Sequence, residues 1–330
     1  MREIAVFSGS AHPRLAAEVC AHLGVSLHPV EVHRFANDCL EVQLRANCRE
    51  RDVFLIQPLV RPVQENLVEL LLMLDAARGA SAGRITVVMP HYSYARSDKK
   101  DAPRISIGGR LLADLMVTAG ANRVLAMTLH SPQVHGFFSV PVDHLHALHE
   151  LADHFRNLDL SNTTVVSPDL GNAKEAAAFA RMLGTPVAAG AKQRFSEDRV
   201  VITSIIGDVA GRDVIVLDDE IAKGSTILEL LDQMRGVGVR SVRVACTHGL
   251  FAGGALKRIG DQPEVVEIVC TNTVPVPMSE RIDKLVVLSI APALAAAISR
   301  IHNGESVSAL FDSTNPTVGP VTRAAIEDPD

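Results

Sequence analysis

The chain has 330 residues, which at roughly 150 residues per domain suggests two domains with enough chain to bury a large core. Apolar residues make up 47% and charged residues 21%, a composition that excludes a wholly disordered, collagen-like or coiled-coil protein. The 32 Lys and Arg against 38 Asp and Glu give a net charge of −6, so we expect no nucleic-acid binding through a broad basic surface. Small anionic ligands are not excluded.

The apolar segments of the chain are too short to cross a membrane. The longest, residues 67–74 and 290–298, fall well short of the roughly 20 residues that span a bilayer, and the first residues do not form a signal peptide. We therefore expect a cytoplasmic protein without membrane contacts. The cysteines are far apart, are odd in number and include no C-x-x-C pair, so neither a disulfide framework nor a zinc site is expected.

Short β-branched segments alternate with longer helical ones along the chain. Helices are predicted at residues 13–23, 63–78, 107–118 and 227–234, and strands at 4–7, 52–57, 84–90, 123–127, 163–166, 213–217, 241–246 and 265–270. The segments VFLIQ (53–57) and ITVVMP (85–90) are continuously apolar, as expected where both faces of a strand are covered. The pattern predicts the α/β class, with mainly parallel sheets flanked by helices.

Two parts of the chain resemble each other. Residues 84–90 match 212–218, and the spacing of apolar and acidic residues in 112–130 matches that in 230–248. We interpret these as two copies of one α/β unit, although chance similarity of two such units is the alternative. The predicted domains are residues 1–146, with an enlarged loop at 92–104, and residues 147–311. Residues 312–330 are polar and without periodicity, and are expected to form a disordered tail.

The strongest chemical pattern is VIVLDDEIAKGST at residues 214–226. A buried strand brings Asp218 and Asp219 to its carboxyl end, and a loop with Gly, Ser and Thr then begins a helix whose N–H groups suit a phosphate. Carboxylates there suit sugar hydroxyls or Mg²⁺. The alternative is an ordinary helix N-cap by Ser225 or Thr226. An ATPase of the P-loop type is excluded, because no G-x-x-x-x-G-K-[ST] occurs.

Cationic side chains on two loops suit a polyphosphate. Arg96, Lys99 and Lys100 lie in the enlarged loop after a predicted strand, and Lys192 and Arg194 lie in a polar stretch that is expected to be mobile. Such cations stabilise the charge that develops on a reacting phosphoryl group, although ordinary surface charge is the alternative.

One imidazole and one carboxylate also follow predicted strands. His130 and Asp169 are therefore expected at the same sheet edge, as contacts for Mg²⁺ or a nucleotide. A histidine at a strand end is, however, often only a hydrogen-bonded residue.

Read together, these segments resemble the ribose-phosphate pyrophosphokinases, also called phosphoribosyl diphosphate synthases. The likeness runs from Phe7 to Phe311 and includes FSGSAHPRLA, PHYSYARSDKK, LHSPQVHGFFSVPVDHL, VVSPDLG, KQR, SIIGDVAGRDVIVLDDEIAKGST and IHNGESVSALF. The resemblance implies two tandem phosphoribosyltransferase-like domains with the site between them. It also implies transfer of the β,γ-diphosphate of Mg-ATP to the anomeric hydroxyl of ribose 5-phosphate, with release of AMP.

The resemblance implies a role for each residue that matches a family motif. The ATP site would comprise Phe35, Asn37, Cys39, Arg96, Ser97, Asp98 and His130, partly supplied by a neighbouring subunit of a homo-oligomer built from dimers, typically a hexamer. His130 and Asp169 would contact Mg²⁺; Lys192, Arg194 and His130 would be catalytic. The ribose 5-phosphate site would comprise Asp218, Asp219, Ala222, Lys223, Gly224, Ser225 and Thr226, and a regulatory site Arg49, Ser81, Ser306, Ser308 and Phe311.

The chain departs from the family pattern at several of these positions. Asn37 and Cys39 stand where the family usually has Asp and Glu, Ser97 stands for Gln, Thr128 for Asp, Ala222 and Lys223 for Asp-Thr, and Ser225 for Gly. These changes support a second hypothesis, a weakly active or inactive paralogue that binds nucleotide or sugar phosphate and regulates a true synthase. The retained loop cations and strand-end carboxylates favour the active enzyme. A phosphoribosyltransferase fits less well, because the enlarged loop and tandem domains match the synthase.

Overall fold

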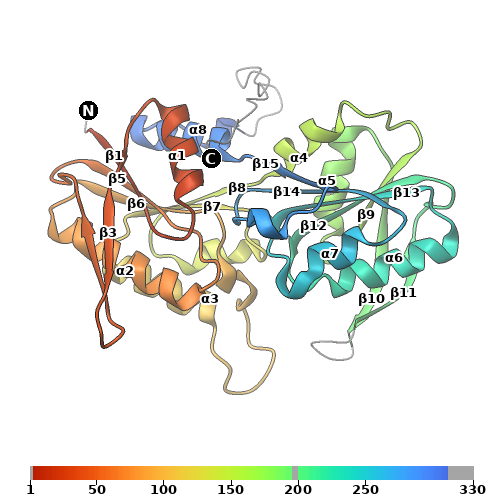
Figure 1. Ribbon diagram of the computed structural model, residues 1–330, viewed down its shortest axis with the longest axis horizontal. Coiled ribbons are helices and arrows are strands. Elements are labelled where there is room, and N and C mark those ends of the chain that lie inside the picture. The colour runs from red at the N-terminus through yellow and green to blue at the C-terminus, as the bar shows by residue number, and fades with distance from the viewer. Residues whose placement is uncertain (1–2, 195–199, 311–330) are drawn as a thin grey trace.

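The chain folds into two β-sheets that lie side by side, each with helices on both faces (Figure 1). The computed structural model describes residues 3–194 and 200–310. The predicted tail and Phe311 lie outside these ranges. Nearly all strand pairs are parallel, so the predicted α/β class is confirmed.

The first sheet has six strands in the order β2-β1-β5-β6-β7-β8, and every pair is parallel. Its strands are β1 (Ile4–Ser8), β2 (Leu27–His28), β5 (Asp52–Ile56), β6 (Arg84–Met89), β7 (Arg123–Met127) and β8 (Val142–Leu145). The helices in this part of the chain are α1 (Pro13–Leu23), α2 (Val63–Gly79) and α3 (Gly108–Ala119). A hairpin of β3 (Val30–Arg34) and β4 (Leu40–Leu44) stands apart from the sheet.

The second sheet has seven strands in the order β11-β10-β9-β12-β13-β14-β15. These are β9 (Thr163–Ser167), β10 (Val187–Arg194), β11 (Val200–Ile206), β12 (Asp213–Ile221), β13 (Ser241–Gly249), β14 (Val265–Thr271) and β15 (Leu285–Leu288). The helices after β8 are α4 (Leu148–Phe155), α5 (Ala173–Leu183), α6 (Ser225–Val237), α7 (Ala255–Gly260) and α8 (Ala291–Asn303). Within this sheet, only β10 and β11 of the described strands pair antiparallel.

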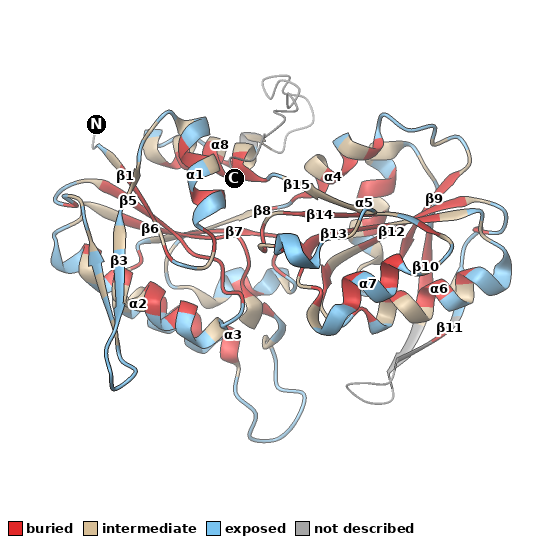
Figure 2. Cartoon of the chain, viewed as in Figure 1, coloured by how far each residue is buried: buried red, intermediate tan, exposed pale blue. Residues whose placement is uncertain are grey.

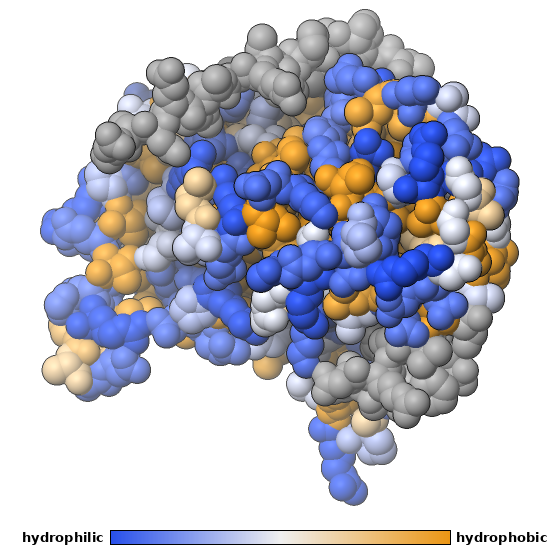
Figure 3. All heavy atoms as spheres, turned by 45° about the vertical axis from the view of Figure 1, so that its right-hand side comes forward, coloured by the Kyte–Doolittle hydropathy of each residue, from blue (hydrophilic) through white to orange (hydrophobic). Residues whose placement is uncertain are grey.

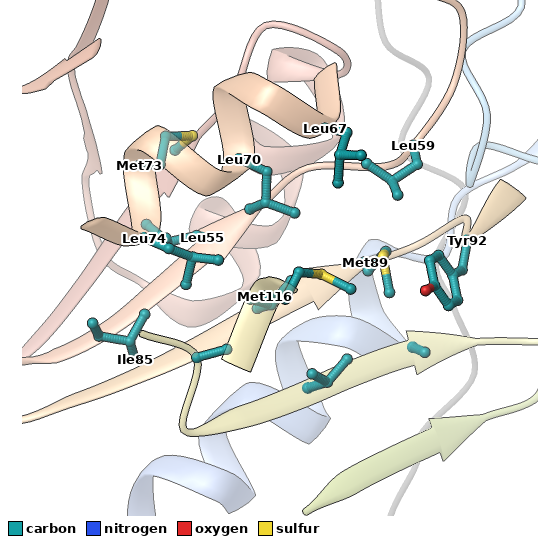
Figure 4. Close-up of a cluster of buried hydrophobic side chains, with 14 of the residues drawn as sticks. Leu55, Leu59, Leu67, Leu70, Met73, Leu74, Ile85, Met89, Tyr92 and Met116 are labelled. Atoms are coloured by element: carbon teal, nitrogen blue, oxygen red, sulfur yellow. The ribbon is translucent and has the colours of Figure 1, made fainter. Parts of the chain in front are cut away.

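The apolar strands are buried on both faces because successive side chains enter two different cores. In β5, Val53 and Leu55 face the core under α2 and α3 that Figure 4 shows, whereas Phe54 and Ile56 face the core under α1 and α8. All five residues of β5 are buried. The continuous apolar runs of the sequence therefore reflect parallel strands between two helical layers (Figure 2).

The two sheets share one strand order, which corrects the proposed repeat. The order β2-β1-β5-β6-β7-β8 in the first sheet matches the order β10-β9-β12-β13-β14-β15 in the second. Strand β12 therefore corresponds to β5 and not to β6. The residues agree, since RDVFLI at 51–56 matches RDVIVL at 212–217. The pairing of 84–90 with 212–218 is wrong by one strand, because buried parallel strands have similar apolar sequences.

Two helices, α4 and α8, each follow a strand of one sheet along the chain but pack against the other sheet. Helix α4 follows β8, yet Leu151 and Phe155 pack in the second half with Val165 and Ile215. Helix α8 follows β15, yet it packs on α1 and the first sheet. A domain boundary at residue 146 stays a proposal. If the chain is divided there, α8 belongs to the second domain by sequence but packs with the first domain.

A buried carboxylate ties α8 to the first sheet. The Asp52 side chain is only 2% exposed, and it accepts hydrogen bonds from Arg84 Nε (2.8 Å) and His302 Nδ1 (2.8 Å). Arg84 also donates to the Ile301 carbonyl oxygen at 2.9 Å. This network joins β5, β6 and the end of α8.

We expect Asp52→Asn to lower the free energy of unfolding by about 3 kcal/mol, because breaking a buried ion pair leaves its cationic partner uncompensated. Urea denaturation followed by circular dichroism measures this loss. Asp75→Asn is the matched control, since Asp75 pairs with Arg78 on the exposed face of α2 and should contribute less than about 1 kcal/mol. Equal losses in the two variants would contradict the anchoring role of Asp52.

The described parts of the chain include no helix that is long and apolar enough to span a membrane. On the face shown in Figure 3, apolar residues form small groups among hydrophilic ones. The polar groups that concern function lie instead in a cleft between the two halves.

Candidate active site

A cleft of about 2210 Å³ lies where the carboxyl ends of strands from both halves meet. The first half lines it with residues that include Arg96, Asp98 and His130, and the second half with Asp169 and residues 218–226. In parallel sheets these ends are where ligands bind. The structure thus brings the expected ribose 5-phosphate residues together with three of the expected ATP residues, Arg96, Asp98 and His130.

Strand β12 carries two acidic residues into the cleft. It pairs with β9 only as far as Val216, but continues beside β13 to Ile221, so Asp218 and Asp219 lie beyond the end of β9. The Asp219 amide donates to Asp218 Oδ1 at 3.0 Å. Burial, and next the charge of Asp219, raise the pKa of Asp218 well above its usual range. A pair of neighbouring carboxylates that share a site is suited to bind adjacent hydroxyl groups.

An ion pair crosses the cleft between the two halves. His130, on the loop after β7, donates from Nδ1 to Asp219 Oδ2 at 2.6 Å. This hydrogen bond raises the pKa of His130 although burial opposes it. Burial acts to raise the pKa of Asp219, but the contact with His130 lowers it. The imidazole is therefore held against the carboxylate pair rather than packed as a core histidine.

The loop 222–226 lines the cleft at the start of α6. Gly224 has φ +72° and occupies the N-cap, and no side chain of the described residues caps the helix. The alternative of an N-cap by Ser225 or Thr226 is therefore wrong. Arg258 of α7 donates to the Lys223 carbonyl oxygen at 2.6 Å and fixes the loop. The first residues of α6, Ser225 to Ile227, line the cleft, and the free N–H groups at a helix N-terminus suit a phosphate.

Gly224→Ala should weaken the binding of ribose 5-phosphate about tenfold, because a left-handed conformation costs an L-residue roughly 1–2 kcal/mol. A Cβ there would also meet Ile259 Cδ1 at 3.0 Å and Ala255 Cβ at 3.3 Å, so the loop must shift. Isothermal titration calorimetry measures the affinity. Gly24→Ala is the control, with φ +68° and no atom within 4 Å. Equal affinity in the two variants would show that the loop does not bind the sugar phosphate.

The enlarged loop after β6 divides into cleft and anchoring residues. Arg96, Asp98 and Lys99 line the cleft, and Asp98 accepts a hydrogen bond from Gln133 at 2.6 Å. Ser97 does not line it, since its hydroxyl accepts from the Gly108 N–H at 2.8 Å and anchors the start of α3. The loop from 99 to 106 is exposed (Figure 2).

Three expected ATP residues lie on the turn of the β3–β4 hairpin, outside the cleft of this chain. Phe35 is 44% exposed and its ring meets His33 edge-on at 4.8 Å. Cys39 donates its N–H to Asn37 Oδ1 at 3.3 Å, and all three side chains are exposed. The hairpin lies on the side of the first half that faces away from the second half (Figure 1). Within one chain, these three residues are therefore apart from the other expected ATP residues.

The second expected metal ligand, Asp169, lies on the loop after β9 and lines the cleft. Its Oδ1 accepts the Asn172 N–H at 3.1 Å. The described residues contain no cluster of three side chains arranged to hold a metal. The backbone of Lys192 and Arg194 ends β10, but their side chains lie outside what the structure describes.

The expected regulatory residues lie away from the cleft. Arg49 precedes β5, and Ser81 precedes β6. An isolated β-bridge pairs Arg49 with Ala82, the residue after Ser81. The Ser306 carbonyl accepts from Arg300 at 3.1 Å, and Ser308 begins a short 3-10 helix, η5 (Ser308–Leu310). Phe311 lies beyond the described residues.

Two buried residues that join the halves were not predicted from the sequence, and one of them, Glu220, lines the cleft. Glu220 follows the carboxylate pair on β12, and His91 follows β6; they hydrogen-bond across the two halves at 3.1 Å. Their positions at the ends of apolar strands could have marked them as site candidates. Nothing in the sequence indicates that these two distant residues contact each other.

Comparison with known proteins supports the family resemblance of the sequence over nearly the whole chain. Residues 4–120 match a family described as the N-terminal domain of ribose phosphate pyrophosphokinase, and residues 193–312 match the phosphoribosyl synthetase-associated domain. A ribose-phosphate pyrophosphokinase of Deinococcus radiodurans is 48% identical over 93% of this chain and 97% of its own. A Streptomyces coelicolor protein that carries the same name provisionally is 80% identical, over 95% of this chain and 99% of its own.

A solved structure agrees as well. The phosphoribosylpyrophosphate synthetase of Mycobacterium smegmatis is similar with a TM-score of 0.86 and 37% identity, over 92% of this chain and all of that one. The fold and the cleft define an α/β transferase of phosphate-containing groups. The chain belongs to the ribose-phosphate pyrophosphokinase family. The regulatory paralogue finds no support in these comparisons.

Proposed function

We propose that this chain joins ribose 5-phosphate to the β,γ-diphosphate of ATP through the residues of the cleft. The anomeric hydroxyl oxygen attacks the β-phosphorus, and the bond from that phosphorus to the α,β-bridging oxygen breaks. AMP leaves with the bridging oxygen, and the hydroxyl proton passes to solvent water. The observation that carries the proposal is the 2.6 Å contact of His130 with Asp219, which joins the half proposed to bind ATP to the half proposed to bind the sugar.

Strand β12 and the following loop bind the sugar phosphate. Asp218 and Asp219 accept hydrogen bonds from the ribose hydroxyls, and the loop from Ala222 to Thr226 receives the 5-phosphate. The N–H groups at the start of α6 and the Ser225 and Thr226 hydroxyls are its donors. Lys223 adds a positive charge at the same loop. This arrangement orients the anomeric carbon toward the first half of the chain.

The first half binds ATP. Arg96 and Asp98 line the cleft beside His130, and the arginine neutralises phosphate charge. Ser97 contributes by anchoring the loop to α3. The exposed Phe35, Asn37 and Cys39 complete the adenine site of a neighbouring subunit, which requires a homo-oligomer. We propose that this homo-oligomer is built from dimers that assemble into a hexamer.

The carboxylates of the cleft fit Mg²⁺ carried by ATP. This cation usually keeps several waters and takes only one or two protein carboxylates beside substrate phosphates, so a cluster of three protein ligands is not required. His130 and Asp169 line the same cleft and would hold it. When bound, the cation neutralises the diphosphate and leaves the β-phosphorus open to attack.

The loop cations act on the charge that develops during transfer. Lys192 and Arg194, together with His130, would stabilise the departing bridging oxygen and the diphosphate oxygens. Arg49, Ser81, Ser306, Ser308 and Phe311 would bind a regulatory anion. A cytoplasmic location stays a prediction.

Phosphorus NMR of the protein with Mg-ATP and ribose 5-phosphate tests the function. We expect AMP and 5-phosphoribosyl 1-diphosphate to appear in equal amounts. Folded protein that binds both substrates yet forms neither product would contradict the proposal.

A further inference from the structure

A buried carboxylate on β12 links the two halves of the cleft. The Glu220 side chain is 6% exposed, and it extends from the face of the strand opposite to that of Asp219. Its Oε2 is 3.1 Å from His91 Nε2, and its Oε1 is 3.2 Å from Arg96 Nε. Burial acts to raise the pKa of Glu220, but the contacts with His91 and Arg96 lower it, so the group is a carboxylate.

His91 is held in one orientation. Its Nδ1 lies 3.0 Å from the Leu59 carbonyl oxygen, which only accepts, so Nδ1 carries a proton and Nε2 faces Glu220. The ring meets His248 edge-on at 4.8 Å. His248 in turn donates from Nε2 to the Thr128 carbonyl oxygen at 2.9 Å, and burial lowers its pKa to about 4. A neutral His248 therefore packs against the His91 ring.

Arg96 is the exposed member of this network. Its side chain is 50% exposed and lines the cleft, although its Nε is paired with the buried carboxylate. The two Nη nitrogens are its remaining donors, and they are the ones that grip a phosphate. Because Nε is held, the guanidinium loses less freedom when a phosphate binds.

We propose that Glu220, held by His91, is a positioning residue that orients Arg96 toward the phosphates of ATP. The inference rests on the ATP-binding role proposed for Arg96. Glu220 adjoins Asp218 and Asp219 on β12, so one strand of the second half sets both the sugar contacts and the orientation of an ATP contact from the first half.

Calorimetric titration with Mg-ATP tests the inference in Glu220→Gln, Arg96→Gln and the double variant. If Glu220 acts through Arg96, each single variant should weaken ATP binding about tenfold and the double variant no more than Arg96→Gln alone. Titration with ribose 5-phosphate should give affinities within about twofold of the unaltered protein. A purely structural role would instead weaken both substrates.

Two further variants support the comparison. Glu264→Gln is the matched control: this carboxylate is 9% exposed and pairs with Arg235 at 2.8 Å, but it precedes β14 at the opposite edge of the sheet, so ATP affinity should not change. His91→Asn keeps a donor for the Leu59 carbonyl but is too short to reach Glu220. It should weaken ATP binding about threefold, and it serves if Glu220→Gln does not fold.

The inference would be overturned if the loss of ATP affinity in the double variant equalled the product of the losses in the two single variants. It would also be overturned if ATP affinity were unaltered in both Glu220→Gln and His91→Asn. Either result would leave the ATP role of Arg96 standing. Unaltered ATP affinity in Arg96→Gln would overturn both.

Discussion

Asp219→Ala is expected to lower kcat/KM about 10³-fold, because it removes a sugar ligand and releases His130 at the same time. The 2.6 Å hydrogen bond between these residues is what raises the pKa of His130, so that pKa should fall in the variant. Steady-state kinetics measures the first effect, and proton NMR titration of the His130 ring measures the second.

Asp75→Ala is the matched control, because Asp75 pairs with Arg78 on the exposed face of α2. Both kcat/KM and the pKa of His130 should be unchanged in this variant. Unchanged kcat/KM in Asp219→Ala would mean that the ion pair across the cleft has no part in the reaction.

Asp218→Asn is expected to weaken ribose 5-phosphate binding about 100-fold, since hydrogen bonds to an ionised acceptor are roughly twice as strong as neutral ones. The raised pKa of Asp218 adds a pH dependence. Sugar affinity should decline as the pH falls through that raised pKa, because the carboxylate becomes protonated, and the variant should lack this dependence. Calorimetry at several pH values measures both effects.

The affinity for ATP in the same Asp218→Asn protein is the control, and should stay within about twofold. Equal weakening of both substrates would indicate a general disturbance of the cleft. Normal sugar affinity would remove Asp218 from the ribose site.

The sequence was informative where chemistry coincides with the ends of buried parallel strands. Asp218, Asp169 and His130 each follow an apolar strand, and parallel strands bring such positions to one edge. The fold class followed from the same strands, as β5 and β6 show. These predictions needed only local patterns.

Features that depend on tertiary packing escaped the sequence. The match of β6 with β12 failed because apolar strands resemble one another, and strand order alone corrected it. Nothing local indicates that α8 packs on the first sheet, because an apolar helix face fits either core. The pair of His91 with Glu220 joins the two halves, and only the fold brings them into contact.

The most direct test of the account follows the β-phosphate of ATP. With ATP labelled at that position and ribose 5-phosphate, the account predicts that all released label is found in the sugar product, with unlabelled AMP as the nucleotide product. Label in ADP, accompanied by a sugar bisphosphate, would show transfer of the γ-phosphate alone and would contradict attack at the β-phosphorus.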